Sequence, residues 1–263
     1  MPMTSDSLQA GSPPSLTGAR AGFLQRVLAH PGFILPRDFT LFLRSARTDA
    51  AIARTRATAG ARAAFEEAYT RSGDPWASAA PRYRYQALKY EQIMALLPQR
   101  RFQQVLDLGC GLGLLSQHLA RRSDAVLGLD FAAAAVGHAR GRAAGIANLT
   151  FEQADILDLP GGLDGRFDLV VVADTLYYLS PLSDEVLKTL SARLARLLAP
   201  GGLLVLANHF FFAADPDSRL TRRIHDAFTW SPHFSVTGHH RRSFFLATLL
   251  APRDVETSAL PAT

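Results

Sequence analysis

Short apolar runs alternate with longer amphipathic segments along the chain from residue 102 onward. The short runs predict strands, and the spacing of apolar residues between them predicts helices. The predicted strands cover residues 105–108, 125–130, 149–153, 167–173 and 203–208, and the helices between them cover 114–122, 131–144 and 184–198. This alternation is typical of an α/β fold whose parallel sheet is covered by helices on both faces.

The end of this region has a different pattern. Residues 233–238 and 243–250 are two apolar stretches separated by a short basic turn. They predict an antiparallel hairpin at one edge of the sheet. We expect the sheet domain to cover residues 99–250 and to be followed by a C-terminal tail at 251–263.

The chain before the sheet domain is expected to form a tail and a helical segment. Residues 1–20 are rich in Ser, Pro and Gly and hold little that could bury a core, so we predict a disordered tail. Residues 21–98 form an N-terminal helical segment, with predicted helices over 48–71 and 83–97. A dense apolar patch lies at 31–43, where a substrate lid, a membrane contact and a dimer contact are all open interpretations.

The stretch Val-Leu-Asp-Leu-Gly-Cys-Gly-Leu-Gly at residues 105–113 is the most informative in the chain. It predicts a buried strand, then a turn with glycine at every second position, then a helix. Such a turn lets a ligand approach the main chain and is a ready site for a nucleoside cofactor. A dinucleotide fingerprint needs a glycine at position 114, which is Leu114, so a nicotinamide cofactor is disfavoured. A tight turn without a ligand is the structural alternative.

The D-x-G-x-G-x-G spacing of this stretch resembles the first motif of the class I S-adenosylmethionine (SAM) methyltransferases. The resemblance implies a Rossmann-like, seven-stranded sheet that is mostly parallel, with its last strand antiparallel. It also implies SAM as the cofactor.

A second resemblance lies at residues 74–90. Asp74-Pro75-Trp76, followed by Tyr85-x-x-x-Lys89-Tyr90, is similar to the nodulation protein S group of N-methyltransferases, which methylate an amino sugar. The likeness covers roughly residues 74–250 and implies that the N-terminal segment forms a lid over the cofactor. The 73 residues before Asp74 are largely lacking in that group, so an amino-sugar substrate does not transfer to this chain.

The candidate cofactor-binding residues follow the strand ends. Asp130 ends the second predicted strand, where a carboxylate can accept hydrogen bonds from both ribose hydroxyls. The resemblance implies that Asp155 and the residue after it hold the adenine, and that Asp107 lies near the methionine ammonium. Each acid could instead be an ordinary structural aspartate. The full candidate set is Asp107, Gly109, Gly111, Gly113, Asp130, Phe131, Asp155, Ile156, Asp174, Trp76, Tyr85 and Lys89.

Methyl transfer from a sulfonium is an in-line displacement, so the protein mainly aligns the nucleophile. A nearby base helps an amine or a hydroxyl to react, and histidine titrates in the useful range. His209, just after the fifth predicted strand, is the first candidate base, and His225 is the second. Tyr177 or Tyr178 could orient the acceptor.

Two nucleic-acid chemistries are disfavoured. Residues 174–179 lack the Asn/Asp-Pro-Pro-aromatic tetrapeptide of enzymes that methylate base amino groups. Cytosine-carbon methylation needs a catalytic cysteine, and Cys110 lies inside the glycine turn instead. We therefore expect no DNA substrate.

Composition narrows the setting. The chain has 263 residues, a net charge of +5 carried mainly by scattered arginines, and one cysteine. The scatter favours coding bias over an RNA-binding surface, and the cysteine count predicts a cytoplasmic protein. No apolar run reaches the ~18 residues of a membrane span, and the N-terminus lacks a secretory signal pattern.

These features predict a SAM-dependent methyltransferase that acts on a nitrogen or oxygen of a small molecule, such as a sugar or a secondary metabolite. A monomer and a homodimer are both compatible with the sequence, and no metal is expected. The alternatives are a methyltransferase that acts on RNA or protein, and a SAM-binding protein without catalysis.

Overall fold

The computed structural model describes residues 36–179, 181–210, 216–242 and 244–253. The predicted tail at 1–20 lies outside these residues, as do the first part of the apolar patch and most of the C-terminal tail. None of the helices within the described ranges has the length and apolarity that a membrane crossing needs.

A seven-stranded sheet forms the centre of the domain, in the order β3-β2-β1-β4-β5-β7-β6. The first five strands of this order are parallel, and β7 pairs antiparallel with both β5 and β6. The strands are β1 (Phe102–Leu108), β2 (Ser123–Asp130), β3 (Leu149–Gln153), β4 (Phe167–Ala173), β5 (Leu198–Phe210), β6 (Phe234–Arg242) and β7 (Phe244–Pro252). The predicted alternation and the antiparallel hairpin are both confirmed, as is the Rossmann-like fold.

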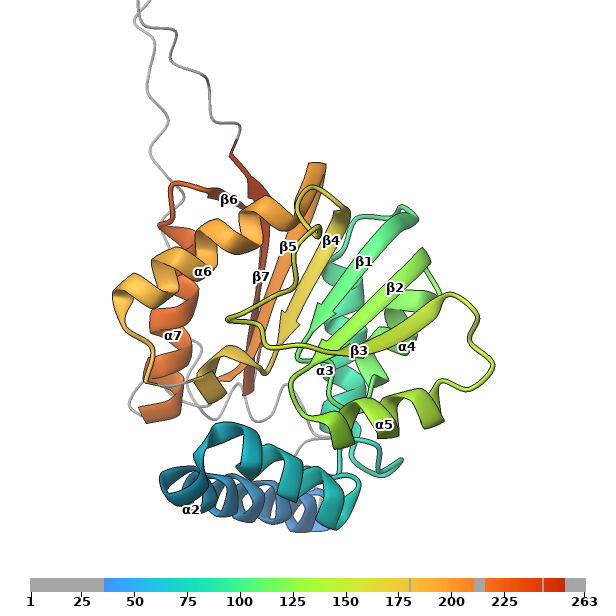
Figure 1. Cartoon of the computed structure of the whole chain (residues 1–263), viewed down its shortest axis with the longest axis vertical. Coiled ribbons are helices and arrows are strands. Elements are labelled where there is room, and N and C mark those ends of the chain that lie inside the picture. Colours follow the sequence, from blue (N-terminus) through green and yellow to red (C-terminus); the bar gives the residue numbers. More distant parts are fainter. Residues whose placement is uncertain (1–35, 180, 211–215, 243, 254–263) are drawn as a thin grey trace, which may run out of the picture.

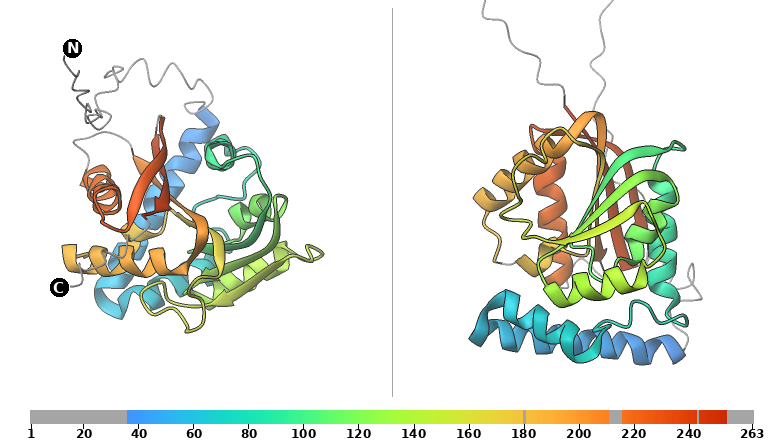
Figure 2. Two further views of the ribbon diagram at one scale, coloured as in Figure 1. Left: turned by 90° about the horizontal axis from the view of Figure 1, so that it is seen from above. Right: turned by 45° about the vertical axis from the view of Figure 1, so that its right-hand side comes forward.

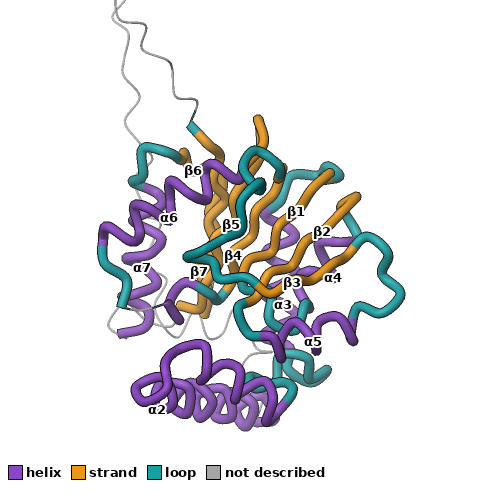
Figure 3. The backbone as a smooth tube through the Cα atoms, viewed as in Figure 1, coloured by secondary structure: helices purple, strands orange, loops and turns teal. Residues whose placement is uncertain are grey.

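Helices cover both faces of the sheet (Figure 1, Figure 3). One face packs against α3 (Arg84–Leu96), α4 (Leu114–Ala120) and α5 (Ala133–Arg142), and the other packs against α6 (Asp184–Leu197) and α7 (Pro216–Thr229). Each face has its own core of buried Leu, Val, Ile and Phe side chains. A short 3₁₀ turn, η1 (Leu176–Leu179), follows β4 at the carboxyl edge of the sheet.

The helix α2 (Pro36–Ser72) is longer than the 48–71 helix that the sequence predicted. It consists of two helical arms joined at Gly60, whose φ of 85° and ψ of 167° interrupt the helix. The arms fold back on each other, and Thr55 Oγ1 donates a hydrogen bond to Glu67 Oε2 across them at 3.3 Å. Figures 1 and 2 show both arms lying across the carboxyl ends of the strands. We refer to α2 as the cap.

The turn between β1 and α4 depends on glycine. Gly113 lies at the start of α4 with a φ of 69°, in the left-handed region that favours glycine. A Cβ at this position would come within 2.5 Å of the Phe151 ring on β3. The backbone of the turn therefore packs directly against the side chain of Phe151, from a strand that lies beyond β2 in the sheet.

Substituting Gly113→Ala is expected to lower the free energy of unfolding by about 3 kcal/mol, from backbone strain and overpacking together. Chemical denaturation followed by circular dichroism measures the change. The matched control is Gly137→Ala inside α5, where a new Cβ meets nothing within 4 Å. That control should raise stability by up to ~1 kcal/mol, and an equally harmless Gly113→Ala would contradict the packing described here.

Candidate functional site

A cavity of about 540 Å³ lies at the carboxyl edge of the sheet, with walls from both the sheet and the cap. Small-molecule sites commonly measure about 300–1,000 Å³. The floor comes from the glycine turn and from the ends of β2, β4 and β5, while the cap, the loop at 73–83 and α3 close the other sides. All the candidate residues line this cavity except Gly113 and His225.

Gly109 and Gly111 form the bare part of the floor. Their φ angles are 72° and 52°, which glycine adopts without strain. A Cβ at Gly109 would lie 2.2 Å from Thr175 Oγ1, and a Cβ at Gly111 would lie 2.9 Å from Tyr69 Oη. The backbone N–H groups of Gly109 and Cys110 donate to the Leu129 carbonyl at 2.7 and 3.0 Å, which joins the turn to β2.

Two buried carboxylates stand beside this turn. Asp130 is 7% exposed and accepts hydrogen bonds from the backbone N–H groups of Gly111 and Ala132, at 2.9 and 3.0 Å. Asp107 is 2% exposed and accepts from Ser116 Oγ at 2.5 Å. Burial raises the pKa of each carboxyl to about 6, because a charge is poorly solvated there.

The end of β3 adds Asp155 and Ile156 to the wall. Asp155 Oδ1 accepts a hydrogen bond from the Leu157 backbone N–H at 2.9 Å. The other carboxylate oxygen, Oδ2, takes no part in this hydrogen bond. Ile156 is buried and belongs to the core on the α6 side of the sheet.

An aromatic cluster closes the cavity over the floor. The Phe65 ring of the cap lies 5.0 to 6.0 Å from the rings of Trp76, Phe131 and Tyr178. Trp76 and Phe131 were expected from the sequence, but Phe65 and Tyr69 were not. Their helical spacing within the 48–71 prediction indicated an apolar face, but not what that face covers.

Asp49 links the cap to the rest of the site, a role that was not predicted from its place in the sequence. Its Oδ1 accepts hydrogen bonds from Trp76 Nε1 at 2.8 Å and from Tyr178 Oη at 2.9 Å. Arg56 on the same helix donates to the Tyr178 carbonyl at 2.6 Å. Polar contacts thus hold the cap against both the 73–83 loop and η1.

Lys89 and Asp174 form an ion pair at the inner wall of the cavity. Lys89 is 3% exposed, and its Nζ lies 5.6 and 5.4 Å from the ring centroids of Tyr85 and Tyr90. Asp174 has a φ of 51° and accepts the His209 N–H through Oδ1 at 2.9 Å. The pair therefore joins α3 to the ends of β4 and β5.

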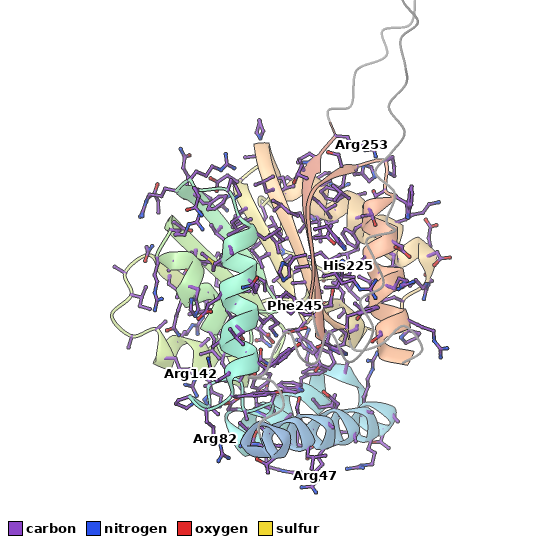
Figure 4. The ribbon with its side chains drawn as sticks, turned by 180° about the vertical axis from the view of Figure 1, so that it is seen from behind. Arg47, Arg82, Arg142, His225, Phe245 and Arg253 are labelled. Atoms are coloured by element: carbon purple, nitrogen blue, oxygen red, sulfur yellow. The ribbon has the colours of Figure 1, made fainter. Side chains whose placement is uncertain are left out.

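The two histidine candidates differ in position. The His209 ring lies 4.4 Å from the Tyr177 ring, and both residues line the cavity. His225 lies within the body of the domain (Figure 4), where its ring contacts Thr248 Oγ1 at 3.0 Å and Asn208 Oδ1 at 3.1 Å. Burial lowers the pKa of His225 to about 3. Because it lies outside the cavity, His225 is not carried forward as a catalytic candidate.

The known proteins that are similar to this chain are methyltransferases. Residues 105–202 match the family described as "Methyltransferase domain". Malonyl-[acyl-carrier protein] O-methyltransferase of Enterobacter lignolyticus is 33% identical over 195 residues, which cover 69% of this chain and 73% of that protein. Trans-aconitate 2-methyltransferase of Deinococcus radiodurans is 42% identical over 122 residues, covering 44% and 43%.

Among solved structures, the N-methyltransferase NodS of Bradyrhizobium japonicum in complex with S-adenosylhomocysteine (SAH) matches with a TM-score of 0.61. It is 21% identical and covers 72% of this chain and 97% of its own, so it supports the fold alone. The chain spans 43% to 64% of the lengths of the first curated relatives that it matches.

The chain belongs to the class I methyltransferase family. Its cofactor is S-adenosylmethionine, and the residues present fit that group. The glycine backbone at positions 109 and 111 is the kind of surface that a ligand can approach closely. Buried carboxylates on neighbouring strand ends supply acceptors for hydroxyl and ammonium groups.

The Asp174→Asn substitution tests whether the ion pair between Lys89 and Asp174 stabilises the inner wall of the cavity. The new amide nitrogen would face Lys89 Nζ, donor against donor, and leave a buried cation without its anion. We expect a loss of about 3 kcal/mol of unfolding free energy, at the lower end for buried pairs because Asp174 is partly exposed.

Urea denaturation measures this loss. The control is Asp124→Asn, which removes the exposed pair with Arg101 and should change stability by less than about 0.5 kcal/mol. Equal, small effects of both variants would show that the inner pair does not hold the site together.

Proposed function

We propose that this chain transfers the methyl group of SAM to a nitrogen or an oxygen of a small molecule bound beneath the cap. The observation that carries the proposal is the cavity between the glycine turn, which forms its floor, and α2, which forms its roof. A roof formed by the cap leaves room for a compact acceptor beside the cofactor. The name of the Deinococcus relative, which specifies trans-aconitate, supports an acceptor of this size.

The cofactor's nucleoside half is assigned to the strand ends. Asp130 would accept hydrogen bonds from the two ribose hydroxyls, in line with its place at the end of β2. Asp155 would hold the adenine amino group, with Ile156 and Phe131 against the ring. All four of these residues line the same cavity.

The methionine half is assigned to the inner wall. Asp107 and the Gly109 backbone would contact the amino-acid portion, and Lys89 with Asp174 would close the wall behind it. Trp76 and Tyr85, from the loop and α3, would cover the cofactor from the cap side.

The bound cofactor supplies a methyl group on a positively charged sulfur. The chain's own residues align the acceptor and remove its proton. Tyr177 would orient the acceptor, and the His209 imidazole would take the proton. Alignment alone can lower a barrier by about 7–11 kcal/mol, so the enclosing walls matter at least as much as the base.

The affinity for SAH should fall as the pH is lowered through about 6. The pKa of Asp130 is raised to about 6, and only the ionised carboxylate accepts from both ribose hydroxyls. Calorimetric titration with SAH between pH 5 and pH 8 measures this dependence. Below the pKa, the dissociation constant of SAH should rise by a factor that approaches tenfold per pH unit for each carboxyl that must be ionised.

The Asp130→Asn variant should bind SAH about tenfold or more weakly at neutral pH, since it loses charge-assisted hydrogen bonds worth about 1.5–3 kcal/mol. Its pH dependence should be shallower but not absent, because Asp107 also titrates near 6. Wild-type affinity in this variant would contradict the ribose assignment.

His209→Ala is expected to lower kcat about a hundredfold with SAM and acceptor both saturating, as general-base catalysis commonly contributes at least that much. Binding of SAH should stay within a few-fold of wild type. His233→Ala, in the loop before β6 and away from the lining residues, serves as the control. Unchanged turnover in His209→Ala would remove the base from the mechanism.

A further inference from the structure

The charges that line the cavity are mostly negative. Among the described lining residues, Lys89 is the only lysine or arginine, and the aspartates are Asp49, Asp74, Asp107, Asp130, Asp155 and Asp174. The Lys89 charge is already opposed by Asp174. An acceptor that carries a carboxylate or a phosphate would therefore be repelled at short range, while an ammonium would be attracted.

These aspartates differ in the groups that they bind. Asp74 accepts the backbone N–H groups of Ser78 and Ala79, at 2.8 and 2.9 Å, and so shapes the loop. The three on the ends of β1, β2 and β3 are the acids assigned to the cofactor. Of the other two, Asp174 pairs with Lys89 at the wall assigned to the methionine half, and Asp49 on the cap carries no cofactor assignment.

A continuous series of side chains connects these two carboxylates. Asp49 accepts from Tyr178 Oη, and the Tyr178 ring lies 4.3 Å from the Tyr177 ring. The Tyr177 ring contacts His209, whose backbone N–H donates to Asp174. The acceptor region is thus bounded by a carboxylate at each end and by aromatic rings between them. Aromatic faces near a carboxylate are a common way to bind organic cations.

A buried acceptor atom points to the same chemistry. Gln86 on α3 lines the cavity, and its Oε1 is buried with no hydrogen-bond partner among the described residues. It lies one helical turn before Lys89 and Tyr90. Buried polar atoms in folded proteins are nearly always satisfied, so this oxygen calls for a donor from a bound molecule, which an ammonium can supply and a carboxylate cannot.

We propose that the acceptor is an amine that enters the cavity as an ammonium ion, and that Asp49 sets this preference. The proposal rests on the methyltransferase function proposed above and narrows its substrate class. It separates this chain from two of its relatives. The name of the Enterobacter protein specifies a malonyl group and O-methylation, and the name of the Deinococcus protein specifies the carboxylic acid trans-aconitate.

The chemistry balances without a further reactant. The ammonium gives one proton to the His209 imidazole and becomes a neutral amine. The nitrogen lone pair then forms the bond to the methyl carbon, while the electron pair of the carbon–sulfur bond passes to sulfur. The products are the protonated N-methyl amine and neutral-sulfur SAH, and the imidazole returns its proton to solvent.

The test measures binding of benzylamine, benzyl alcohol and benzoate to the SAH-loaded full-length chain by ligand-observed NMR. We expect benzylamine to bind at least about tenfold more tightly than benzoate. In Asp49→Asn this ratio should fall toward one, since a charge-assisted contact is commonly worth about tenfold. The asparagine Oδ1 can still accept from Trp76 and Tyr178, so the variant removes the charge and keeps these two contacts.

Glu91→Gln, an exposed position on α3, is the matched control and should keep the wild-type ratio. Benzoate that binds as tightly as benzylamine would overturn the proposal, and so would a ratio that Asp49→Asn leaves unchanged.

A turnover assay with methyl-labelled SAM distinguishes this inference from the function on which it rests. Three pools are offered separately: primary and secondary amines, carboxylic acids, and alcohols with phenols. Label in the amine pool supports the proposal. Label only in the acid pool or only in the hydroxyl pool overturns the amine assignment and leaves the small-molecule methyltransferase intact. Label in none of the three pools, with SAH bound, contradicts both.

Discussion

The bare backbone at Gly109 and Gly111 is the constraint on which the site depends. A side chain at Gly109 would occupy the position of Thr175, and one at Gly111 would meet Tyr69 of the cap. The glycine turn therefore lets segments after β1 and β4 and from the cap meet at one place. That meeting brings the acids of the strand ends, the 174–179 segment and the cap around a common cavity. A bulkier turn would separate the cap from the sheet and leave no enclosed site.

Polar contacts attach the cap and α3 to the sheet. The cap is held by hydrogen bonds that cross long stretches of sequence, such as Asp49 to Tyr178, 129 positions apart. Lys89 and Asp174 form the corresponding contact on the inner side. Such contacts have direction, so they place rings and carboxylates at defined positions, which apolar packing alone does not do. The same contacts hold the cap close to the part of the cavity that is assigned to the cofactor.

Much of the sheet could be predicted from the sequence, because its signal is local. The strands at 149–153 and 167–173 were predicted at their observed bounds, since each is a short apolar run between breaks. The grouping of acids at one edge of the sheet agrees with the rule that parallel strands bring their carboxyl ends together, while the roles expected of Asp107 and Asp155 came from the resemblance to the methyltransferases. The position of Asp130 beside the glycine turn is an example of that rule in the structure.

The fold-back of α2 at Gly60 had no such local signal, because one glycine in a helical pattern is compatible with a straight helix. The roles of Asp49 and Phe65 depend on that fold-back, and so they could not be predicted. The position of His225 could not be predicted either, because the side chain of this residue on α7, the helix after β5, is turned into the core, where it contacts Asn208 and Thr248.

Hydrogen–deuterium exchange with and without SAH tests most directly whether the cofactor lies between the glycine turn and the cap. The account predicts that SAH slows exchange at residues 109–113, at the end of β2, and in both arms of α2. Protection of the turn and of β2 with no change in α2 would contradict the cap as the roof of the site. Protection confined to other parts of the chain would contradict the location of the site itself.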